Sequence, residues 1–337
     1  MNPHILITGA PGWLGNRFIE VLLNDKNPLL RQLNPASLRA LTLPGMPIRS
    51  LQEKGIEIVE GNVADRASLA KATQGIDIVF HLAGIVHAKK PRDFIEINAR
   101  GTQNLLESAI QSGCSRFVFI SSNSAAGVQT SSQQLMTETT EDHPYLTYGK
   151  SKKMAEDWIL EAQKQGRIEG VILRPCWYYG PGQPARQTRF FKMIQKGNPL
   201  VFGNGLNLRS MSYLDNVIDG LLLAAMTPKA AGQIYWIADG EPYPTLEIYK
   251  TVARLLGVKK FKPRHIPSLT STLCRLADRI FQGGGFYQQE IHVAGEMTLN
   301  IGCSIEKAKR ELGYQPQVSL EEGMRRSIEW CQQNGQL

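Results

Sequence analysis

The chain has 337 residues, of which 42% are hydrophobic and 20% are charged, and its formal net charge at pH 7 is +8. This length and composition fit a soluble globular protein built from one large α/β unit or two modest domains. The basic residues are scattered and form no stripe, which argues against a nucleic-acid partner and favours an anionic small-molecule ligand.

Short apolar runs alternate with helical periodicity through the first half of the chain. The predicted strands are 4–8, 38–43, 56–59, 76–82, 116–121 and 170–174. Residues 14–23 and 101–110 lie between strands and carry apolar side chains at helical spacing. Near-continuous apolar strands separated by helices predict an α/β protein with a doubly wound parallel sheet covered on both faces.

Beyond this alternating half the sequence becomes rich in turns. We therefore predict a nucleotide-binding domain over residues 1–175, with its sheet completed by about 216–240. A smaller substrate-binding region is expected from 176–215 together with 241–337. Within it, residues 269–281 are apolar at helical spacing; packing as core is expected, and a lipophilic substrate or a membrane surface are the alternatives.

Cysteine usage and the lack of targeting signals bear on the compartment. Five cysteines stand far apart without a Cys-x-x-Cys pair, so neither a disulfide framework nor a zinc site is expected, and a reducing cytoplasm is the predicted location. No signal peptide is evident, and no run approaches the ~18–20 apolar residues of a transmembrane helix. A small-molecule substrate, no metal and no transmembrane segment are therefore predicted.

A glycine-rich segment lies between the first predicted strand and the first predicted helix. Its glycines are Gly9, Gly12 and Gly15, and Trp13 and Leu14 begin the helix. Glycines at such a turn let the backbone approach a pyrophosphate, and the helix N-terminus offers free N–H groups to the anion. The Gly-x-x-Gly-x-x-Gly spacing differs from the general Gly-x-Gly-x-x-Gly pattern, and a simple turn is the alternative.

Three further residues predict acid–base chemistry. Tyr148 and Lys152 are four apart on a predicted helix and share one face, and an adjacent ammonium stabilises the phenolate of a tyrosine whose usual pKa is ~10. Ser122 follows a predicted strand, where a hydroxyl can bond a substrate oxygen. An accidental surface pair and a helix-capping serine are the alternatives.

With the glycine-rich segment, Ser122 and the Tyr148–Lys152 pair in this order, the chain resembles the extended short-chain dehydrogenase/reductase family over nearly its whole length. The resemblance is closest to the branch that holds 3β-hydroxysteroid dehydrogenase-like enzymes and nucleotide-sugar epimerases. Further matching segments are Asn62-Val63, His81 to Gly84, Asn98, Gly101-Thr102, Arg174-Pro175, Tyr179 to Gly182, Tyr213 to Asn216 and Glu311 to Tyr314. Asn62 departs from the pattern, since the family usually has aspartate there.

The resemblance implies a Rossmann-type fold and a role for each matching residue. Tyr148 would be the general acid/base, Lys152 would lower its pKa and bind the nicotinamide ribose, and Ser122 would orient the substrate oxygen. The implied cofactor contacts are Gly9, Gly12, Trp13, Leu14, Gly15, Asn62, Val63, Leu82, Ala83, Gly84, Tyr148, Lys152 and Pro175. The implied substrate contacts are Ser122, Asn123, Trp177 and Arg209. Asn98 is expected to hold local backbone, His81 to be a satisfied buried histidine, and the protein to form a homodimer.

The segment after the second predicted strand bears on the choice between NAD and NADP. NAD enzymes usually place an acidic residue there to hold the ribose hydroxyls, whereas an arginine accommodates a 2′-phosphate. Residues 27–51 contain no Asp or Glu, Leu43 stands where the acid is expected, and Arg31, Arg39 and Arg49 are present. The sequence therefore favours NADP over NAD.

The residues around Ser122 bear on the reaction. Dehydratases of this family carry an Asp-Glu pair after the catalytic hydroxyl, but Asn123 and Ser124 stand here, so elimination is not expected. Arg209 matches a position at which nucleotide-sugar epimerases bind the diphosphate of the sugar nucleotide. The second diphosphate-binding arginine of those enzymes is not evident in residues 295–300. A secondary alcohol dehydrogenase or ketone reductase is therefore preferred to a nucleotide-sugar 4-epimerase. A non-catalytic NAD(P)-binding protein is the third alternative, disfavoured because the catalytic set is intact.

Overall fold

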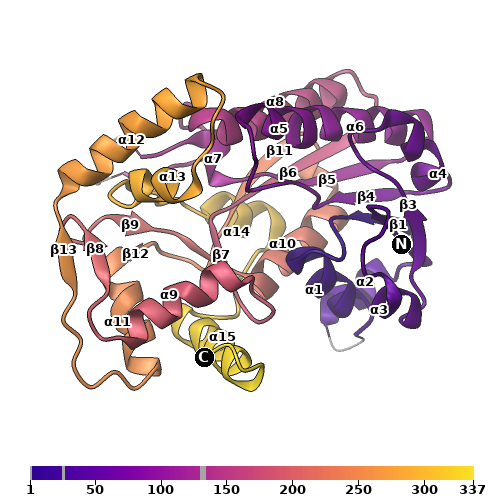
Figure 1. Ribbon diagram of the computed structural model, residues 1–337. Coiled ribbons are helices and arrows are strands. Elements are labelled where there is room, and N and C mark those ends of the chain that lie inside the picture. Colours follow the sequence, from indigo (N-terminus) through magenta and orange to yellow (C-terminus); the bar gives the residue numbers. More distant parts are fainter. Residues whose placement is uncertain (1, 25–26, 130–133) are drawn as a thin grey trace.

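The computed structural model describes residues 2–24, 27–129 and 134–337, and its centre is a seven-stranded parallel sheet (Figure 1). The strand order is β11-β6-β5-β4-β1-β2-β3. The strands are β1 (His4–Thr8), β2 (Ser37–Thr42), β3 (Glu57–Glu60), β4 (Ile78–His81), β5 (Arg116–Ile120), β6 (Glu169–Pro175) and β11 (Gln233–Ile237). Because the chain winds outward from β1 in both directions, the doubly wound Rossmann-type prediction is confirmed.

Helices cover both faces of this sheet. One face packs against α1 (Trp13–Leu22), α2 (Pro28–Leu33), α10 (Leu214–Met226) and α14 (Glu306–Leu312). The other packs against α4 (Leu69–Thr73), α6 (Gly101–Gln111) and α8 (Leu146–Lys164). With both faces covered, a central strand such as β5 is buried at every position. The crevice at the carboxyl ends of these strands is where a doubly wound sheet binds its ligand.

The second half of the chain builds a smaller body with its own apolar cluster beside the sheet (Figure 1). Its strands pair as β7 (Trp177–Tyr179) with β10 (Met211–Tyr213), β8 (Leu200–Phe202) with β13 (Arg264–Ile266), and β9 (Leu208–Arg209) with β12 (Tyr243–Pro244). Its helices are α9 (Ala185–Gln195), α11 (Thr245–Leu255), α12 (Ser268–Gly283), α13 (Gln289–Glu296) and α15 (Leu320–Gln333).

Short elements connect these layers. They are α3 (Arg49–Glu53), α5 (Pro91–Phe94), α7 (Asn123–Ala126), a π-helix (Ile95–Arg100) that runs into α6, and 3₁₀ turns over Arg66–Ser68 and Pro228–Ala230. β11 returns from the second half of the chain and pairs with β6 in the central sheet. The predicted division into a nucleotide-binding domain and a substrate-binding region stays a prediction.

The expectation that residues 269–281 pack as core is wrong. They form most of α12, whose large apolar side chains are exposed, while its buried positions are Ser271 and Asp278. Helical periodicity identifies residues that share a face, but it does not determine whether that face points inward. Within the described part of the chain, no helix is long and apolar enough to cross a membrane.

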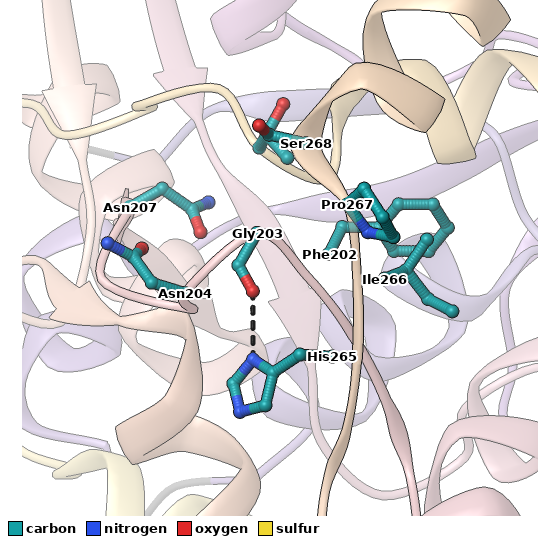
Figure 2. A pocket seen from close by; sticks show the side chains of 9 residues that line it. Phe202, Gly203, Asn204, Asn207, His265, Ile266, Pro267 and Ser268 are labelled. Carbon is teal, nitrogen blue, oxygen red and sulfur yellow. Dashed lines mark hydrogen bonds between the residues drawn. The ribbon is translucent and has the colours of Figure 1, made fainter.

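A hollow of about 700 Å³ lies where β8 and β13 meet the start of α12 (Figure 2). Phe202, Asn207 and Ser268 are among its lining residues, and the Nδ1 atom of His265 lies 2.8 Å from the carbonyl oxygen of Gly203 at its edge. Its lining includes none of the residues that the sequence predicts for cofactor or catalysis.

Candidate active site

The glycine-rich loop after β1 is too tightly packed for side chains at its three glycines. Gly9 has a φ of +93°, and a Cβ atom there would lie 2.7 Å from the carbonyl carbon of Leu82. Cβ atoms at Gly12 and Gly15 would lie 2.5 Å and 2.6 Å from the carbonyl oxygen of Gly9. The three glycines therefore allow the turn to close on itself and against the loop that follows β4.

The first turn of α1 is free to receive an anion. Gly12 is its N-cap and provides no side-chain cap, and no acidic residue lies in the first turn, so the N–H groups and the helix dipole favour a negatively charged ligand. The indole Nε1–H of Trp13 donates to the carbonyl oxygen of Pro181 at 2.7 Å, and Leu14 packs against the apolar core. Trp13 thus ties this loop to the second half of the chain.

The loop after β4 lies between the glycine-rich loop and Lys152. The backbone N–H of Ala83 donates to Thr8 Oγ1 at 3.2 Å. A Cβ atom at Gly84 would lie 3.1 Å from Asn98 Oδ1 and 3.5 Å from Lys152 Nζ. This loop therefore connects the predicted pyrophosphate site to the predicted catalytic lysine.

His81 is buried and fully bonded, as predicted. Its Nδ1 lies 2.7 Å from Thr8 Oγ1 and its Nε2 lies 2.9 Å from Thr102 Oγ1. Because Thr102 Oγ1 donates to the carbonyl oxygen of Asn98, it accepts from Nε2–H, and Nδ1 then accepts from Thr8. Burial, and after it the charge of Lys152, lowers the pKa of His81 to about 3, so the ring stays neutral.

Asn98 holds local backbone, which confirms that prediction. Its Oδ1 accepts from the N–H of Ile85 at 2.8 Å, and its Nδ2 donates to the carbonyl oxygen of Ile85 at 2.9 Å. Asn62 behaves similarly, since its Oδ1 accepts from the N–H of Ala64 at 2.9 Å. Val63, next to it, is buried.

Ser122 and Tyr148 meet beyond the carboxyl end of β5. The hydroxyl of Ser122 caps α7 by accepting from the N–H of Ser124 at 3.2 Å, and it lies close enough to the Tyr148 phenol to affect its pKa. Burial raises the pKa of Tyr148 above its usual value, and the Ser122 hydroxyl and then the charge of Arg186 oppose that shift. The capping and catalytic roles proposed for Ser122 are therefore compatible in one geometry.

Lys152 extends one helical turn beyond Tyr148 toward the same strand end. Its Nζ donates to the carbonyl oxygen of Ile120 at 2.8 Å and lies 4.5 Å from the ring centroid of Phe119. Burial lowers the pKa of Lys152 to about 8, against the opposing charge of Glu156. That Lys152 lowers the pKa of Tyr148 stays a prediction.

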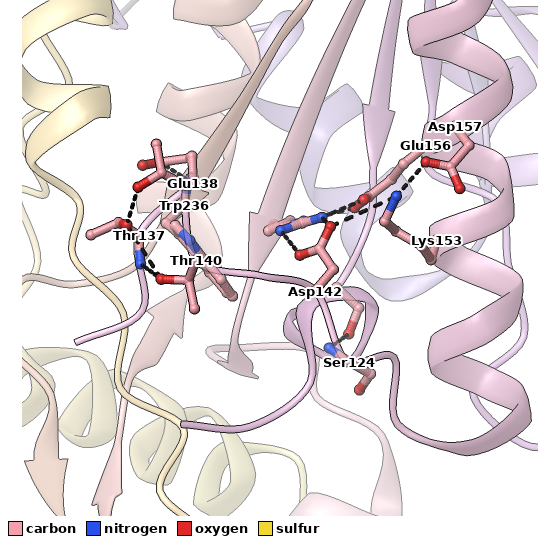
Figure 3. A network of polar contacts seen from close by, with 12 residues as sticks. Ser124, Thr137, Glu138, Thr140, Asp142, Lys153, Glu156, Asp157 and Trp236 are labelled. Atoms are coloured by element: carbon pink, nitrogen blue, oxygen red, sulfur yellow. Dashed lines mark hydrogen bonds and ion pairs between the residues drawn. The ribbon is translucent and has the colours of Figure 1, made fainter. Parts of the chain in front are cut away.

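A buried ion pair anchors α8 to the sheet. Arg174 near the end of β6 donates through Nε to Glu156 Oε1 at 2.9 Å, and its Nη1 and Nη2 each lie 2.8 Å from an Asp142 oxygen. Figure 3 shows Asp142 and Glu156 in this polar network. Arg174 and Glu156 are both fully buried. Because Glu156 lies one turn beyond Lys152, this pair holds the helix that carries both predicted catalytic residues.

Buried hydroxyls without a partner mark the same crevice. Among the described residues, Thr42 Oγ1 at the end of β2, Ser121 Oγ just after β5 and the Tyr178 hydroxyl have no hydrogen-bond partner. Two of these groups follow the carboxyl ends of sheet strands, where a dinucleotide's hydroxyl, amide and phosphate groups would lie. Pro175, the predicted nicotinamide neighbour, is the last residue of β6. The crevice thus fits a polar dinucleotide.

Several residues around Tyr148 were not predicted from the sequence. Arg186 of α9 lies close enough to Tyr148 and Tyr287 for its positive charge to interact with the ionised form of each phenol. It also hydrogen-bonds to His87. Tyr178 is close enough to Tyr148 for that phenol to contribute to the raised pKa of Tyr178, and its ring centroid lies 6.5 Å from that of Trp13. They come from α9 and β7, in a part of the chain without a recognisable motif, and the only signal was that residues 176–215 were expected to belong to the substrate-binding region.

The predicted substrate contacts are divided between the two halves. Asn123 begins α7 directly after Ser122. Trp177 instead packs on Phe190, with ring centroids 5.5 Å apart, in the apolar cluster of the second half. Arg209 is buried, which lowers its pKa, and its Nη2 donates to the carbonyl oxygen of Glu296 at the end of α13. The structure therefore brings together Ser122, Asn123, Tyr148 and Lys152.

The fold and this crevice define a dinucleotide-binding α/β protein of the extended short-chain dehydrogenase/reductase type. Residues 5–238 match the model of the NAD dependent epimerase/dehydratase family, and the chain belongs to that family. It is 39% identical to the uncharacterized protein y4nL of Sinorhizobium fredii (strain NBRC 101917 / NGR234), across 99% of this chain and 96% of that one. It is 26% identical to a UDP-glucose 4-epimerase of Vibrio cholerae, across 98% and 95% of the two chains.

Solved structures agree with the fold. The crystal structure of gox2253 matches with a TM-score of 0.81 at 24% identity over the whole of both chains. DesIV, a dTDP-glucose 4,6-dehydratase from Streptomyces venezuelae solved with NAD and TYD bound, matches with a TM-score of 0.78 at 25% identity over 98% and 97% of the chains. The family and these neighbours include NAD-dependent enzymes.

Proposed function

We propose that the protein is an NAD(P)-dependent oxidoreductase that moves a hydride between nicotinamide and a secondary alcohol or ketone carbon. The observation that carries this proposal is the proximity of the Ser122 hydroxyl to the Tyr148 phenol beyond β5, with Lys152 held at the end of the same strand. A hydroxyl pair beyond the carboxyl end of a doubly wound sheet is placed to receive a substrate oxygen.

Each residue has a task that its surroundings support. The bound nicotinamide supplies or accepts the hydride. Tyr148 gives a proton to the substrate oxygen during reduction and takes it back during oxidation, while Ser122 orients that oxygen. Because burial raises the pKa of Tyr148, the phenol is protonated at neutral pH, which suits ketone reduction. Lys152 binds the nicotinamide ribose and balances the phenolate.

The N-terminus of α1, with Gly9, Gly12 and Gly15, would hold the pyrophosphate. A preference for NADP is supported only by the lack of an acid near Leu43, because Arg39 is paired with Glu57 and also donates to backbone carbonyls. Dissociation constants for NADH and NADPH, compared by the fluorescence of each bound cofactor, decide this preference.

The preferred substrate is a secondary alcohol or ketone, as for 3β-hydroxysteroid dehydrogenase-like enzymes or related ketone reductases. A nucleotide-sugar 4-epimerase that uses tightly bound NAD is the second candidate, favoured by the 26% identity to the Vibrio cholerae UDP-glucose 4-epimerase. Asn123 and Ser124 occupy the positions where dehydratases carry their acidic pair, so elimination is not proposed.

Two incubations separate these candidates. With a UDP-sugar and catalytic NAD, formation of the 4-epimer without net cofactor reduction would support the epimerase. With a hydroxysteroid or a keto compound, a stoichiometric change in NAD(P)H would support the dehydrogenase or reductase. Cofactor binding without turnover across both substrate classes would instead favour a non-catalytic NAD(P)-binding protein.

A cytoplasmic location and a homodimer complete the proposal, both implied by the resemblance and the composition. Light scattering of the purified chain measures the mass, and a monomer at working concentrations would refute the homodimer.

A further inference from the structure

Helix α12 has its polar and apolar faces reversed relative to an ordinary surface helix. At 100° per residue, Leu269, Leu273, Leu276 and Ile280 lie within about 60° of arc, and Ser271 and Asp278 lie on the opposite side. The four apolar side chains are 64%, 57%, 56% and 64% exposed, whereas Ser271 and Asp278 are fully buried. A helix on a soluble surface ordinarily turns its apolar face inward.

Specific polar contacts hold the helix in this orientation. Ser271 Oγ donates to the carbonyl oxygen of Gly295 at 2.9 Å, and Asp278 Oδ2 lies 2.7 Å from Nδ1 of His292. Gln282 Oε1 also accepts from the N–H and the hydroxyl of Thr147 on α8. Rotating α12 to bury its leucines would break all of these bonds, so the apolar face is presented outward by the fold.

Basic residues accompany the apolar face. The cations of residues 259–281 are Lys259, Lys260, Lys262, Arg264, Arg275 and Arg279. The single acidic residue in the same stretch is Asp278, which is buried against His292. β13, which begins at Arg264, and α12 run along the same edge of the molecule (Figure 1). Exposed leucines therefore lie along this edge together with the exposed Arg264 and Arg279.

We propose that α12 and the basic segment before it (residues 259–283) dock the protein on an anionic lipid bilayer. A helix with Leu, Ile and Phe on one side and arginines on its flank lies in the plane of a membrane interface, and adjacent lysines bind anionic headgroups. A second copy of the chain is a poorer occupant, because pairing two such edges would bring like charges together. The proposal is independent of the reaction that the enzyme catalyses.

Vesicle flotation tests this proposal with the full chain. The protein is expected to float with vesicles of phosphatidylcholine and phosphatidylglycerol in equal parts, to stay behind with phosphatidylcholine alone, and to be released by salt. Leu273→Glu combined with Ile280→Glu is expected to weaken binding ~tenfold or more, and Lys260→Gln combined with Lys262→Gln to weaken it less. Leu23→Glu, at an exposed leucine after α1, is the matched control and should float like the wild type.

The variants replace exposed side chains, and unchanged melting temperature and NADH binding verify that they fold. The salt dependence of the wild type tests the electrostatic part without any variant. Absence of flotation on anionic vesicles, or flotation that neither pair of substitutions weakens, would overturn the proposal. So would a wild type that forms oligomers without binding vesicles and that Leu273→Glu with Ile280→Glu converts to monomers.

Discussion

The ammonium of Lys152 lies 2.8 Å from the carbonyl oxygen of Ile120, the last residue of β5. This contact joins the second turn of α8 to the carboxyl end of a central strand, where Ser121 and Ser122 follow. Burial there lowers the pKa of Lys152 to about 8, so a nearby charge changes the fraction of the amine that is protonated near neutral pH. A phenolate on Tyr148 or a bound phosphate would favour its protonated form.

Tyr148→Phe should remove the proton donor while keeping the ring that packs on Phe94 at a centroid distance of 5.6 Å. We expect kcat to fall by about 10²–10⁴-fold, the usual contribution of general acid–base catalysis, with NADH affinity unchanged. Steady-state kinetics and NADH fluorescence measure the two quantities. Tyr235→Phe, which loses a hydroxyl bonded to Glu311, should leave kcat unaltered. Retained turnover in Tyr148→Phe refutes the assigned role.

Arg186→Gln should raise the pKa of Tyr148 further, because the charge of Arg186 lowers it in this structure. Oxidation needs the phenolate, so the rise of kcat/KM with pH should move to higher pH, and the rate at neutral pH should fall several-fold. A pH–rate profile records this shift. Arg189→Gln, on the exposed side of the same helix, is the control. If the rise of kcat/KM stays at the same pH or moves to lower pH, the role given to Arg186 is wrong.

His81 should make the protein sensitive to acid. Burial, followed by the charge of Lys152, lowers its pKa to about 3 from a usual 6.5. Between these two pH values His81 is protonated in the unfolded chain and neutral in the folded chain. Its contribution to stability is present above about pH 6.5 and is lost as the pH falls toward 3. Between about pH 7 and about pH 5 the loss is about 2 kcal/mol.

Urea unfolding of wild type and His81→Asn at these two pH values measures that contribution. The variant should be less stable at neutral pH, since it disturbs the bonds to Thr8 and Thr102. Its further loss on acidification should be smaller than that of the wild type by about 2 kcal/mol. Equal losses would show that His81 is not the titrating group.

Glu156→Gln should destabilise the fold because it leaves the buried guanidinium of Arg174 with one carboxylate in place of two. Removing one member of a buried ion pair costs about 3–5 kcal/mol, and the remaining Asp142 places this variant near the lower end. Asp157→Asn, at the next residue, removes an exposed partner of Lys153 and should cost less than about 1 kcal/mol. Thermal unfolding compares the two, and equal costs would contradict the role given to Glu156.

The central sheet and the glycine-rich loop could be predicted because both depend on local sequence. A buried parallel strand is largely apolar, and the turn at Gly9 admits no side chain at that position. Arg186 and Tyr178 could not be predicted to lie near Tyr148, because they stand on α9 and β7, which only the tertiary fold brings close to α8. The outward apolar face of α12 was missed for a related reason: Asp278 and Ser271 fix its orientation through contacts with distant residues.

A crystal structure of the protein with bound NADH or NADPH tests the central claim most directly. The account predicts the pyrophosphate at the N-terminus of α1 and the nicotinamide ring beside Tyr148 and Ser122, with Lys152 Nζ on the adjoining ribose. A nicotinamide ring remote from the Tyr148 hydroxyl, or bound outside the crevice at the carboxyl ends of the sheet, would contradict it.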